Sequence, residues 1–296
     1  MKKRPFLLAS ALLAGIFVFF LALALTVASF TGRPTSFALG DKVGVIEVFG
    51  VIASSKQIIE QLHDFRDNDS VKAIVLRIDS PGGGVGPSQE IHDEVKLVDA
   101  LKPVVVSMGS VAASGGYYIA APAREILANP GTITGSIGVI MEFTNFQELL
   151  EKIGLSSVVV KSGKHKDIGS PTREMTATDR EILQELIDDV HSQFVTSVAA
   201  GRGLDQEIVA SIADGRIFSG RKAMEIGLVD KMGNLEVAIK RAAELAGISD
   251  EPQVVYPPGK TPSFIDLFIE ESLNRLQFAL QKQRTVGLQY IWPGFN

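Results

Sequence analysis

The chain has 296 residues, of which 46% are hydrophobic, with a formal net charge of −5 and no cysteine. This length fits one large domain or two small ones and can bury a sizeable core. Lys2, Lys3 and Arg4 carry all the charge of the first 30 residues, so the remaining 266 carry 26 basic against 34 acidic residues, a net −8. An acidic body without a basic stripe argues against nucleic-acid binding. The lack of cysteine excludes disulfides, thiolate metal sites and a cysteine nucleophile.

The uncharged stretch after these basic residues predicts a membrane anchor. No residue from Pro5 to Gly32 is charged, and residues 6–30 are almost wholly apolar. A membrane-spanning helix needs about 20 apolar residues, whereas the core of a cleaved signal peptide has about 7–15. We therefore expect an uncleaved transmembrane helix at 6–30, with a cleaved signal sequence as the alternative. The basic residues predict a cytoplasmic N-terminus at 1–5 and an extracytoplasmic body.

Beyond a linker at 31–41, apolar runs alternate with amphipathic stretches. Strands are expected at 43–52, 73–78, 104–108 (ending at a glycine turn), 125–128, 137–141 and 158–160. Helices are expected at 54–65, 88–101 and 146–153. Strands that alternate with helices in this way indicate an α/β fold with a largely buried sheet.

The last third of the chain is expected to be mostly helical. Residues 178–181 have the pattern of a capping box at the start of a long helix, and apolar residues follow at helical spacing. Shorter helices are expected at 219–226 and 235–246. An amphipathic helix is expected at 264–280, and its apolar face is assigned to the core, a subunit interface or a membrane contact as alternatives.

A glycine-rich segment, residues 79–86, directly follows the strand expected at 73–78. Glycines let backbone amides approach a ligand closely or adopt positive φ angles. Neither the Walker spacing nor G-x-G-x-x-G fits, because Pro87 or Gln89 stands where the last glycine is needed. The segment is either a ligand-binding loop or a strand-to-helix turn that requires glycine.

A second glycine-rich segment, residues 109–118, carries Ser114 where a helix is expected to begin. A serine there is exposed on a tight turn, and the N-terminus of a helix favours a developing negative charge. The amide of Gly115 is then placed to donate to an oxyanion. The layout resembles a nucleophile elbow without its G-x-S-x-G spacing. The alternative is a helix of small residues packed tightly on the sheet.

A serine nucleophile requires a base, and histidine and lysine are both available. Three histidines fall within expected amphipathic helices, where a solvated or packed histidine is the usual role: His63, His92 and His191. The fourth, His165, lies in a loop with three lysines: Lys161, Lys164 and Lys166. Spacing alone does not choose among these candidates.

The pair Ser219 and Lys222 has the S-x-x-K spacing of penicillin-binding enzymes. A segment resembling their K-T-G element comes before this pair rather than after it, and no S-D-N stands between them. We interpret the match as chance.

Five segments, in order, resemble the signal peptide peptidase A family, the short-form bacterial protease IV. They are DSPGG (79–83), AASGGYY (112–118), TGSIGV (134–139), KSGKHKDI (161–168) and ADGRIFSG (213–220). The resemblance extends over roughly residues 42–247. It implies a ClpP/crotonase-like fold of ββα units at 42–250, behind the transmembrane helix and followed by a helical extension at 251–296.

The resemblance also implies roles for individual residues. Ser114 corresponds to the nucleophile and Lys166 to the general base of a serine-lysine dyad, with Ser136 orienting the lysine. Gly83 and Gly115 correspond to the oxyanion donors, although Gly82 and Gly84 are adjacent to Gly83. A lysine base must lose its charge near neutral pH, which requires burial. The polar loop of Lys166 is poorly suited to bury it in a monomer, and the resemblance implies a homo-oligomeric ring, expected to be an octamer, in which neighbours complete each site.

The function expected from this resemblance is that of a serine endopeptidase that degrades signal peptides left in the membrane after export, and other apolar or unfolded segments. We expect a single-pass protein of the bacterial cytoplasmic membrane, anchored in the bilayer by 6–30, with a periplasmic or extracytoplasmic catalytic domain. No metal or organic cofactor and no nucleic acid is expected. The alternatives are crotonase-type acyl-CoA chemistry and a non-catalytic oligomeric scaffold.

Overall fold

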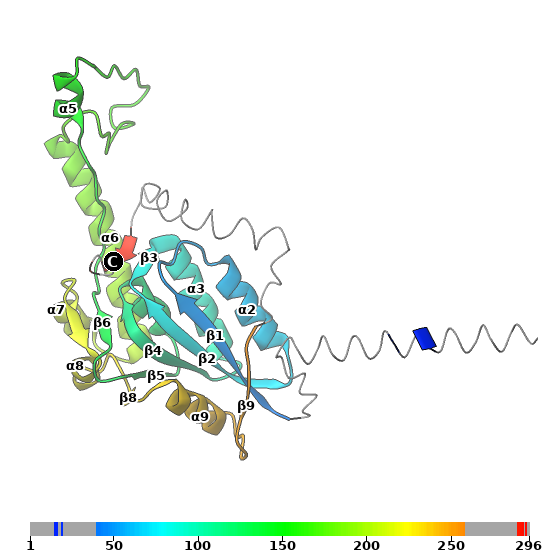
Figure 1. Ribbon diagram of the computed structural model, residues 1–296. Coiled ribbons are helices and arrows are strands. Elements are labelled where there is room, and N and C mark those ends of the chain that lie inside the picture. Colours follow the sequence, from blue (N-terminus) through cyan, green and yellow to red (C-terminus); the bar gives the residue numbers. More distant parts are fainter. Residues whose placement is uncertain (1–14, 17–18, 20–39, 258–288, 293, 295–296) are drawn as a thin grey trace, which may run out of the picture. The chain divides into compact units, whose positions relative to one another are not determined.

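The computed structural model describes residues 15–16, 19, 40–257, 289–292 and 294 (Figure 1). The chain divides into two units, Met1–Gly40 and Asp41–Asn296. No helix among the described residues is both long and apolar enough to cross a membrane. The anchor expected at 6–30 lies almost entirely outside the described residues, and so does the amphipathic helix expected at 264–280.

The described part of the second unit is built on an eight-stranded sheet. Its main path runs β7-β6-β4-β2-β1-β9, and β5 joins β4 to β8. All pairings are parallel except that of β6 with β7. The strands are β1 Lys42–Phe49, β2 Val71–Ser80, β4 Val104–Ala113, β5 Glu125–Ala128, β6 Ile133–Gly135, β7 Ile217–Ser219, β8 Lys231–Met232 and β9 Gln253–Val255.

Helices cover both faces of this sheet (Figure 1). The helices of the described residues are α2 Lys56–Asp67, α3 Val85–Asp99, α4 Gly115–Ala120, α5 Gln147–Lys152, α6 Ala177–Arg202, α7 Gln206–Ile212, α8 Gly220–Glu225 and α9 Leu235–Leu245, and α5 does not pack on the sheet. On β1, Val43 and Val45 pack with α9, whereas Ile46 and Val48 belong to the core beneath α2 and α3. Because successive residues of a strand point to opposite faces, two covered faces explain the nearly continuous apolar runs of the strands.

Strand β4 is longer than the sequence predicted, because it continues through Gly109 to Ala113. Its register with β2 moves from Ile78–Met108 to Ser80–Ala112, so β4 carries extra residues there in a bulge. The Asp79 carboxylate accepts hydrogen bonds from the amides of Ser110 (3.2 Å) and Val111 (3.1 Å). The prediction that the strand ends at a glycine turn was therefore wrong. The strand continues because the Asp79 carboxylate satisfies the amides that the bulge leaves without strand partners.

Four other expectations were also wrong in detail. Residues 158–160 form no strand, and 137–141 contribute only an isolated bridge at Ile140. The capping box of α6 begins at Thr176 rather than at residue 178, with Asp179 as its third helical residue. The long C-terminal stretch includes strands at 253–255 and 289–291.

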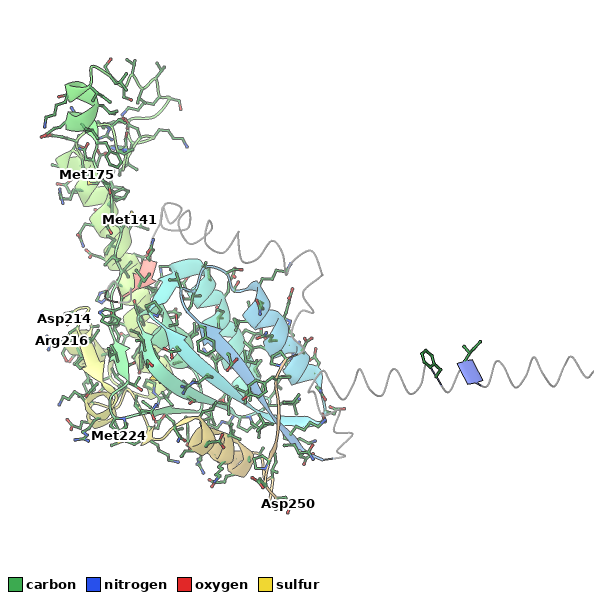
Figure 2. The ribbon with its side chains drawn as sticks, viewed as in Figure 1. Met141, Met175, Asp214, Arg216, Met224 and Asp250 are labelled. Carbon is green, nitrogen blue, oxygen red and sulfur yellow. The ribbon has the colours of Figure 1, made fainter. Side chains whose placement is uncertain are left out.

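Residues 142–176, hereafter the arm, lie around the N-terminal end of α6 and away from the sheet (Figure 1). The arm includes α5 and the lysine-containing loop that follows it. In Figure 2, Met141 lies alongside α6 and Met175 near the N-terminal end of that helix. Helix α6 has 26 residues and therefore spans about 39 Å, which separates the arm from the sheet.

Candidate active site

Ser114 occupies the turn between β4 and α4, where it is 1% exposed. Its φ of 54° and ψ of −117° are unusual for a residue with a side chain. Its amide donates to the Gly135 carbonyl at 2.8 Å, and its carbonyl accepts from the Tyr118 amide at 2.8 Å. The backbone at Ser114 is thus held on both sides in a conformation that costs energy, as is common at functional sites.

Ser136 lies beside Ser114 because β4 and β6 pair in parallel with Ala113 opposite Gly135. Each serine is the residue that follows this last pair. Ser136 is also buried, also has a positive φ, of 50°, and donates from its amide to the Arg216 carbonyl at 2.8 Å. The sheet register therefore brings together two serines that lie 22 residues apart in the sequence.

The three glycines of β3 (Gly82–Gly84) use their amides differently. The Gly82 amide donates to Ser80 Oγ at 3.1 Å, and the Gly84 amide donates to the Ile52 carbonyl at 2.9 Å. The amides of Gly82 and Gly84 are thus engaged within the fold. Gly83 is the glycine of this segment whose amide points to the opposite edge of the strand.

Gly115 brings the start of α4 against this edge. A Cβ atom on Gly115 would lie 2.7 Å from Ser88 Oγ and 3.1 Å from the Gly83 nitrogen. A Cβ atom on Gly82, whose φ is +102°, would lie 2.6 Å from the Gly115 nitrogen. Glycine is required at both positions, and the Gly83 and Gly115 amides lie close together beside Ser114.

The edge of β3 is occupied by the chain's own C-terminal strand, β10 (Gln289–Ile291). It pairs antiparallel with β3, with Tyr290 opposite Gly83. On its other side, Gln289 exchanges two hydrogen bonds of 3.1 Å with Ile140. The segment therefore lies as an extended peptide between two chain edges, β3 and Ile140, next to Ser114, and we call this position between the two edges the cleft. Sequence reasoning missed this strand, and the β-prone run Gln-Tyr-Ile-Trp was the available signal.

None of the four histidines, all of which the structure describes, has a hydrogen bond to Ser114. His63 lies 3.1 Å from Glu94, and His191 Nε2 lies 2.7 Å from the Ala213 carbonyl. His92 is buried, which lowers its pKa and favours the neutral ring. These placements agree with the solvated or packed roles expected for the three helical histidines.

Lys166 is exposed in the arm, in a turn closed by its amide to the Gly163 carbonyl at 3.1 Å. The residues on either side of it are tied to the N-terminal end of α6. His165 Nδ1 lies 3.5 Å from Asp179 Oδ1, and Arg173 bridges Asp167 (2.9 Å) and Asp179 (2.7 Å). Hydrogen bonds from Arg173 hold the pKa of both carboxyl groups well below the ordinary value.

One chain does not bring Lys166 to Ser114. The lysine loop is attached at Asp179, whereas Phe194, fifteen residues further along α6, contacts Tyr290 in the cleft with ring centroids 4.6 Å apart. Fifteen helical residues span about 22 Å. The lysine side chain cannot cover such a distance, so the described residues of a single chain hold the serine and its expected base at different ends of α6.

Ser219 and Lys222, the pair with S-x-x-K spacing, have a structural role. Ser219 Oγ accepts from the Lys222 amide at 3.2 Å and caps α8, and Lys222 Nζ lies 2.9 Å from Glu225. Among the described residues, no three His, Asp or Glu side chains gather as metal ligands would.

Comparison with known proteins gives the family. The profile of peptidase family S49 matches residues 96–249, just over half of the chain, and that of Clp protease matches residues 48–130. The chain is 49% identical over 212 residues to the protease slr0021 of Synechocystis sp., covering 71% of this chain and 76% of the relative.

Two further relatives carry more specific names. The chain is 35% identical over 233 residues to a signal peptide peptidase SppA of Enterococcus faecium, covering 74% of this chain and 68% of the relative. It is 40% identical over 204 residues to Protease 4 of Salmonella typhi, covering 66% of this chain but only 33% of that longer protein. With its ClpP-like α/β fold, this chain is a serine protease that belongs to peptidase family S49, among the signal peptide peptidase A proteins.

Proposed function

We propose that the protein is an endopeptidase with a serine-lysine dyad whose two members come from different subunits. Ser114 attacks the scissile carbonyl while Lys166 of a neighbouring subunit, oriented by Ser136, takes the serine proton. The amides of Gly83 and Gly115 hold the oxyanion. The lysine then protonates the leaving amine, and water releases the acyl-enzyme.

The position of the Tyr290 carbonyl is the observation that carries this proposal. A Cβ atom on Gly82 would lie 1.9 Å from the Tyr290 carbonyl oxygen, and one on Gly115 would lie 3.0 Å from it. A peptide carbonyl therefore already sits where the amides of Gly83 and Gly115 converge beside Ser114. This is the arrangement that a peptidase needs in order to stabilise a tetrahedral intermediate.

The surface of the arm supports a site shared between subunits. Its large apolar side chains face solvent in the single chain, with Val158 85% and Val160 97% exposed, together with Phe146, Leu149, Ile153 and Leu155. An apolar patch of this kind marks an interaction surface. Docking of the arm on a neighbour would bury Lys166 near Ser114, and burial favours the uncharged amine that a general base requires.

The substrates that we propose are signal peptides left after export and other apolar or unfolded segments. The names of the relatives from Enterococcus faecium and Salmonella typhi support peptide substrates. We further propose a ring, an octamer, anchored in the bacterial cytoplasmic membrane by residues 6–30, with the catalytic domain outside the cytoplasm. The charge pattern of the first 30 residues supports that topology.

The test is fluorophosphonate labelling and peptide cleavage by the full-length protein in detergent. Ser114→Ala is expected to abolish labelling and cleavage. Lys166→Ala is expected to reduce both by at least about a thousandfold. Lys164→Ala, which changes an exposed lysine of the same loop, is the matched control and should keep wild-type activity.

Full activity in either dyad variant would contradict the proposal. CoA-dependent turnover without labelling of Ser114 would favour acyl-CoA chemistry instead. Assembly with neither labelling nor cleavage of any apolar peptide would favour a scaffold.

A further inference from the structure

Asp79 joins the two backbone segments that carry the serine and an oxyanion amide. It lies near the end of β2, four residues before Gly83, so its main chain leads directly into β3. Its side chain extends across the sheet to the bulge of β4. There Oδ2 accepts from the Ser110 amide at 3.2 Å, and Oδ1 accepts from the Val111 amide at 3.1 Å. Val111 stands three residues before Ser114, so Asp79 is tied to both halves of the candidate site.

The bulge is shaped to receive this carboxylate. Where the register of β2 and β4 shifts, Asp79 alone stands opposite residues 109–111 of β4. The first of these three is a glycine, and a Cβ atom on Gly109 would lie 2.5 Å from Asp79 Oδ2 and 2.8 Å from its Cγ. Any side chain there would displace the carboxylate. The two residues are therefore matched, because the carboxylate supplies acceptors for the bulge and the glycine leaves it the space.

The carbonyl groups of the bulge are held independently of the Asp79 side chain. Arg77 Nη1 donates to the Met108 carbonyl at 3.1 Å, and Thr132 Oγ1 donates to the Gly109 carbonyl at 2.7 Å. The main chain of Asp79 is fixed as well, since its carbonyl accepts at 3.0 Å from the amide of the first residue after β1. Removal of the carboxylate would therefore free two amides of the bulge within an otherwise intact frame.

The spacing between the serine and the oxyanion amide depends on this bulge. An ordinary ladder would pair β4 with β2 residue by residue, and β4 would reach Ser114 at a different height. One strand residue spans about 3.3 Å. Misplacement of a reacting group by about 1 Å can cost about 100-fold in rate. Partial relaxation of the bulge is thus enough to disturb the alignment of Ser114 with the Gly83 amide.

We propose that Asp79 is a positioning residue of the peptidase reaction: its carboxylate holds the bulge of β4 and thereby sets the distance between Ser114 and the Gly83 amide. The proposal rests on the proposed function for the roles of those two groups. Asp79 acts through the backbone of β4 rather than on the substrate, so its loss weakens binding of the transition state and leaves ground-state binding of the peptide unchanged. The two amides require an acceptor oxygen, which asparagine also supplies.

Peptide cleavage by the full-length protein in detergent gives the first test. Asp79→Ala is expected to lower kcat about 100-fold with KM within about threefold, and Asp79→Asn to recover at least about tenfold of that loss. The matched control is Asp99→Ala, because Asp99 Oδ1 accepts from the Val104 amide at 2.8 Å at the opposite end of the same strand. Its kcat should stay within about threefold of wild type. An equal kcat in Asp79→Ala and Asp99→Ala would overturn the proposal.

Gly109→Ala tests the same contact from the other side. The methyl group displaces the carboxylate, so kcat should fall about 10- to 100-fold although Asp79 is present. In Asp79→Ala/Gly109→Ala the methyl group occupies the space that the carboxylate has left, and kcat should equal that of Asp79→Ala within about threefold. Losses that multiply would overturn the proposal, because the two residues would then act separately. If Asp79→Ala does not assemble, Asp79→Asn/Gly109→Ala replaces it and should match Gly109→Ala.

A peptide aldehyde distinguishes positioning from a general loss of structure. Ser114 Oγ adds to the aldehyde carbon, whose oxygen then needs the oxyanion amides, whereas the corresponding peptide alcohol binds without a new bond. In the wild type the aldehyde should bind at least about 100-fold more tightly than the alcohol. Asp79→Ala should reduce this ratio at least about tenfold and leave the affinity for the alcohol within about threefold.

The outcomes of the aldehyde measurement separate the two proposals. An unchanged ratio in Asp79→Ala would overturn the positioning role and leave the proposed function intact. A wild-type protein that binds the aldehyde no better than the alcohol would contradict the proposed function, on which the positioning role rests.

Discussion

The two ends of helix α6 differ in almost every physical respect. The C-terminal half is buried against the body, where Val190 and Phe194 line the cleft, while Ile182 and Leu186 of the N-terminal half are 38% and 42% exposed. The cleft end is neutral and closed, whereas the arm end is organised by the ion pairs of Arg173 with Asp167 and Asp179.

This difference explains how a dyad can be divided between subunits. The cleft needs a rigid, desolvated environment for the oxyanion and the substrate, which the sheet and α4 provide within one chain. A lysine base near neutral pH needs burial that the arm of the same chain does not supply, because Lys166 is exposed there. In the function that we propose, an arm that presents its lysine and its apolar side chains outward would supply the missing half of a neighbour's site.

The largest effect is expected at the cleft end, from Gly82→Ala. The new methyl group would lie 1.9 Å from the Tyr290 carbonyl oxygen, which occupies the place proposed for the substrate carbonyl, and would be strained at a φ of +102°. We expect kcat/KM for peptide cleavage to fall about 100-fold or more, because the carbonyl can no longer reach the amides. The matched control is Gly86→Ala in α3, where the space around the Cβ position is open and activity should stay within about twofold. Equal activity in the two variants would contradict the position of the oxyanion site.

A smaller effect is expected at the arm end, from Arg173→Ala. The variant frees the loop that holds Lys166, and misplacement of a base by about 1 Å can cost up to about 100-fold in rate. We expect kcat to fall about 10- to 100-fold with KM unchanged, since the cleft is remote, and Arg173→Lys to recover part of the loss. Arg180→Ala, which changes an exposed arginine in the first turn of α6, is the control.

The pH dependence of this variant gives a second readout. Arg173 lowers the pKa of Asp167 and Asp179, so in the wild type both carboxylates stay charged at pH values below the ordinary carboxyl pKa. Without Arg173 their pKa values rise toward the ordinary value, but both groups are still charged above about pH 5. The ratio of variant to wild-type kcat should therefore be constant from about pH 5 to 9. A ratio that changes across this range would indicate that a group of the network itself takes part in proton transfer.

Much of the body could be predicted from the sequence, since apolar runs such as 125–128 and the helix at 235–246 coincide with β5 and α9 within a residue. The continuation of β4 could not, because it depends on the Asp79 carboxylate, which is distant in sequence from the amides that it satisfies. Residues 158–160 look like a strand by composition, yet Val158 and Val160 face solvent with no sheet beside them. Apolar content predicts burial and does not say whether the partner belongs to the same chain.

In the candidate site, too, some features follow from local sequence and others depend on tertiary contacts. The position of Ser114 between a strand and a helix was predictable from its local pattern, whereas Gly83 was selected among the adjacent glycines only through the family resemblance. That Lys166 would lie at the opposite end of α6 could not be predicted, because helix direction and the Arg173 contacts decide it. The occupation of the cleft by residues 289–292 required the tertiary fold.

Mixing two inactive proteins tests the divided dyad most directly. Ser114→Ala and Lys166→Ala subunits are dissociated, combined in equal amounts and allowed to reassemble, and hybrid oligomers are verified by mass. Each interface then has about one chance in four of joining an intact serine with an intact lysine, so about a quarter of wild-type activity should return. Hybrid oligomers that remain inactive would contradict a dyad formed between subunits.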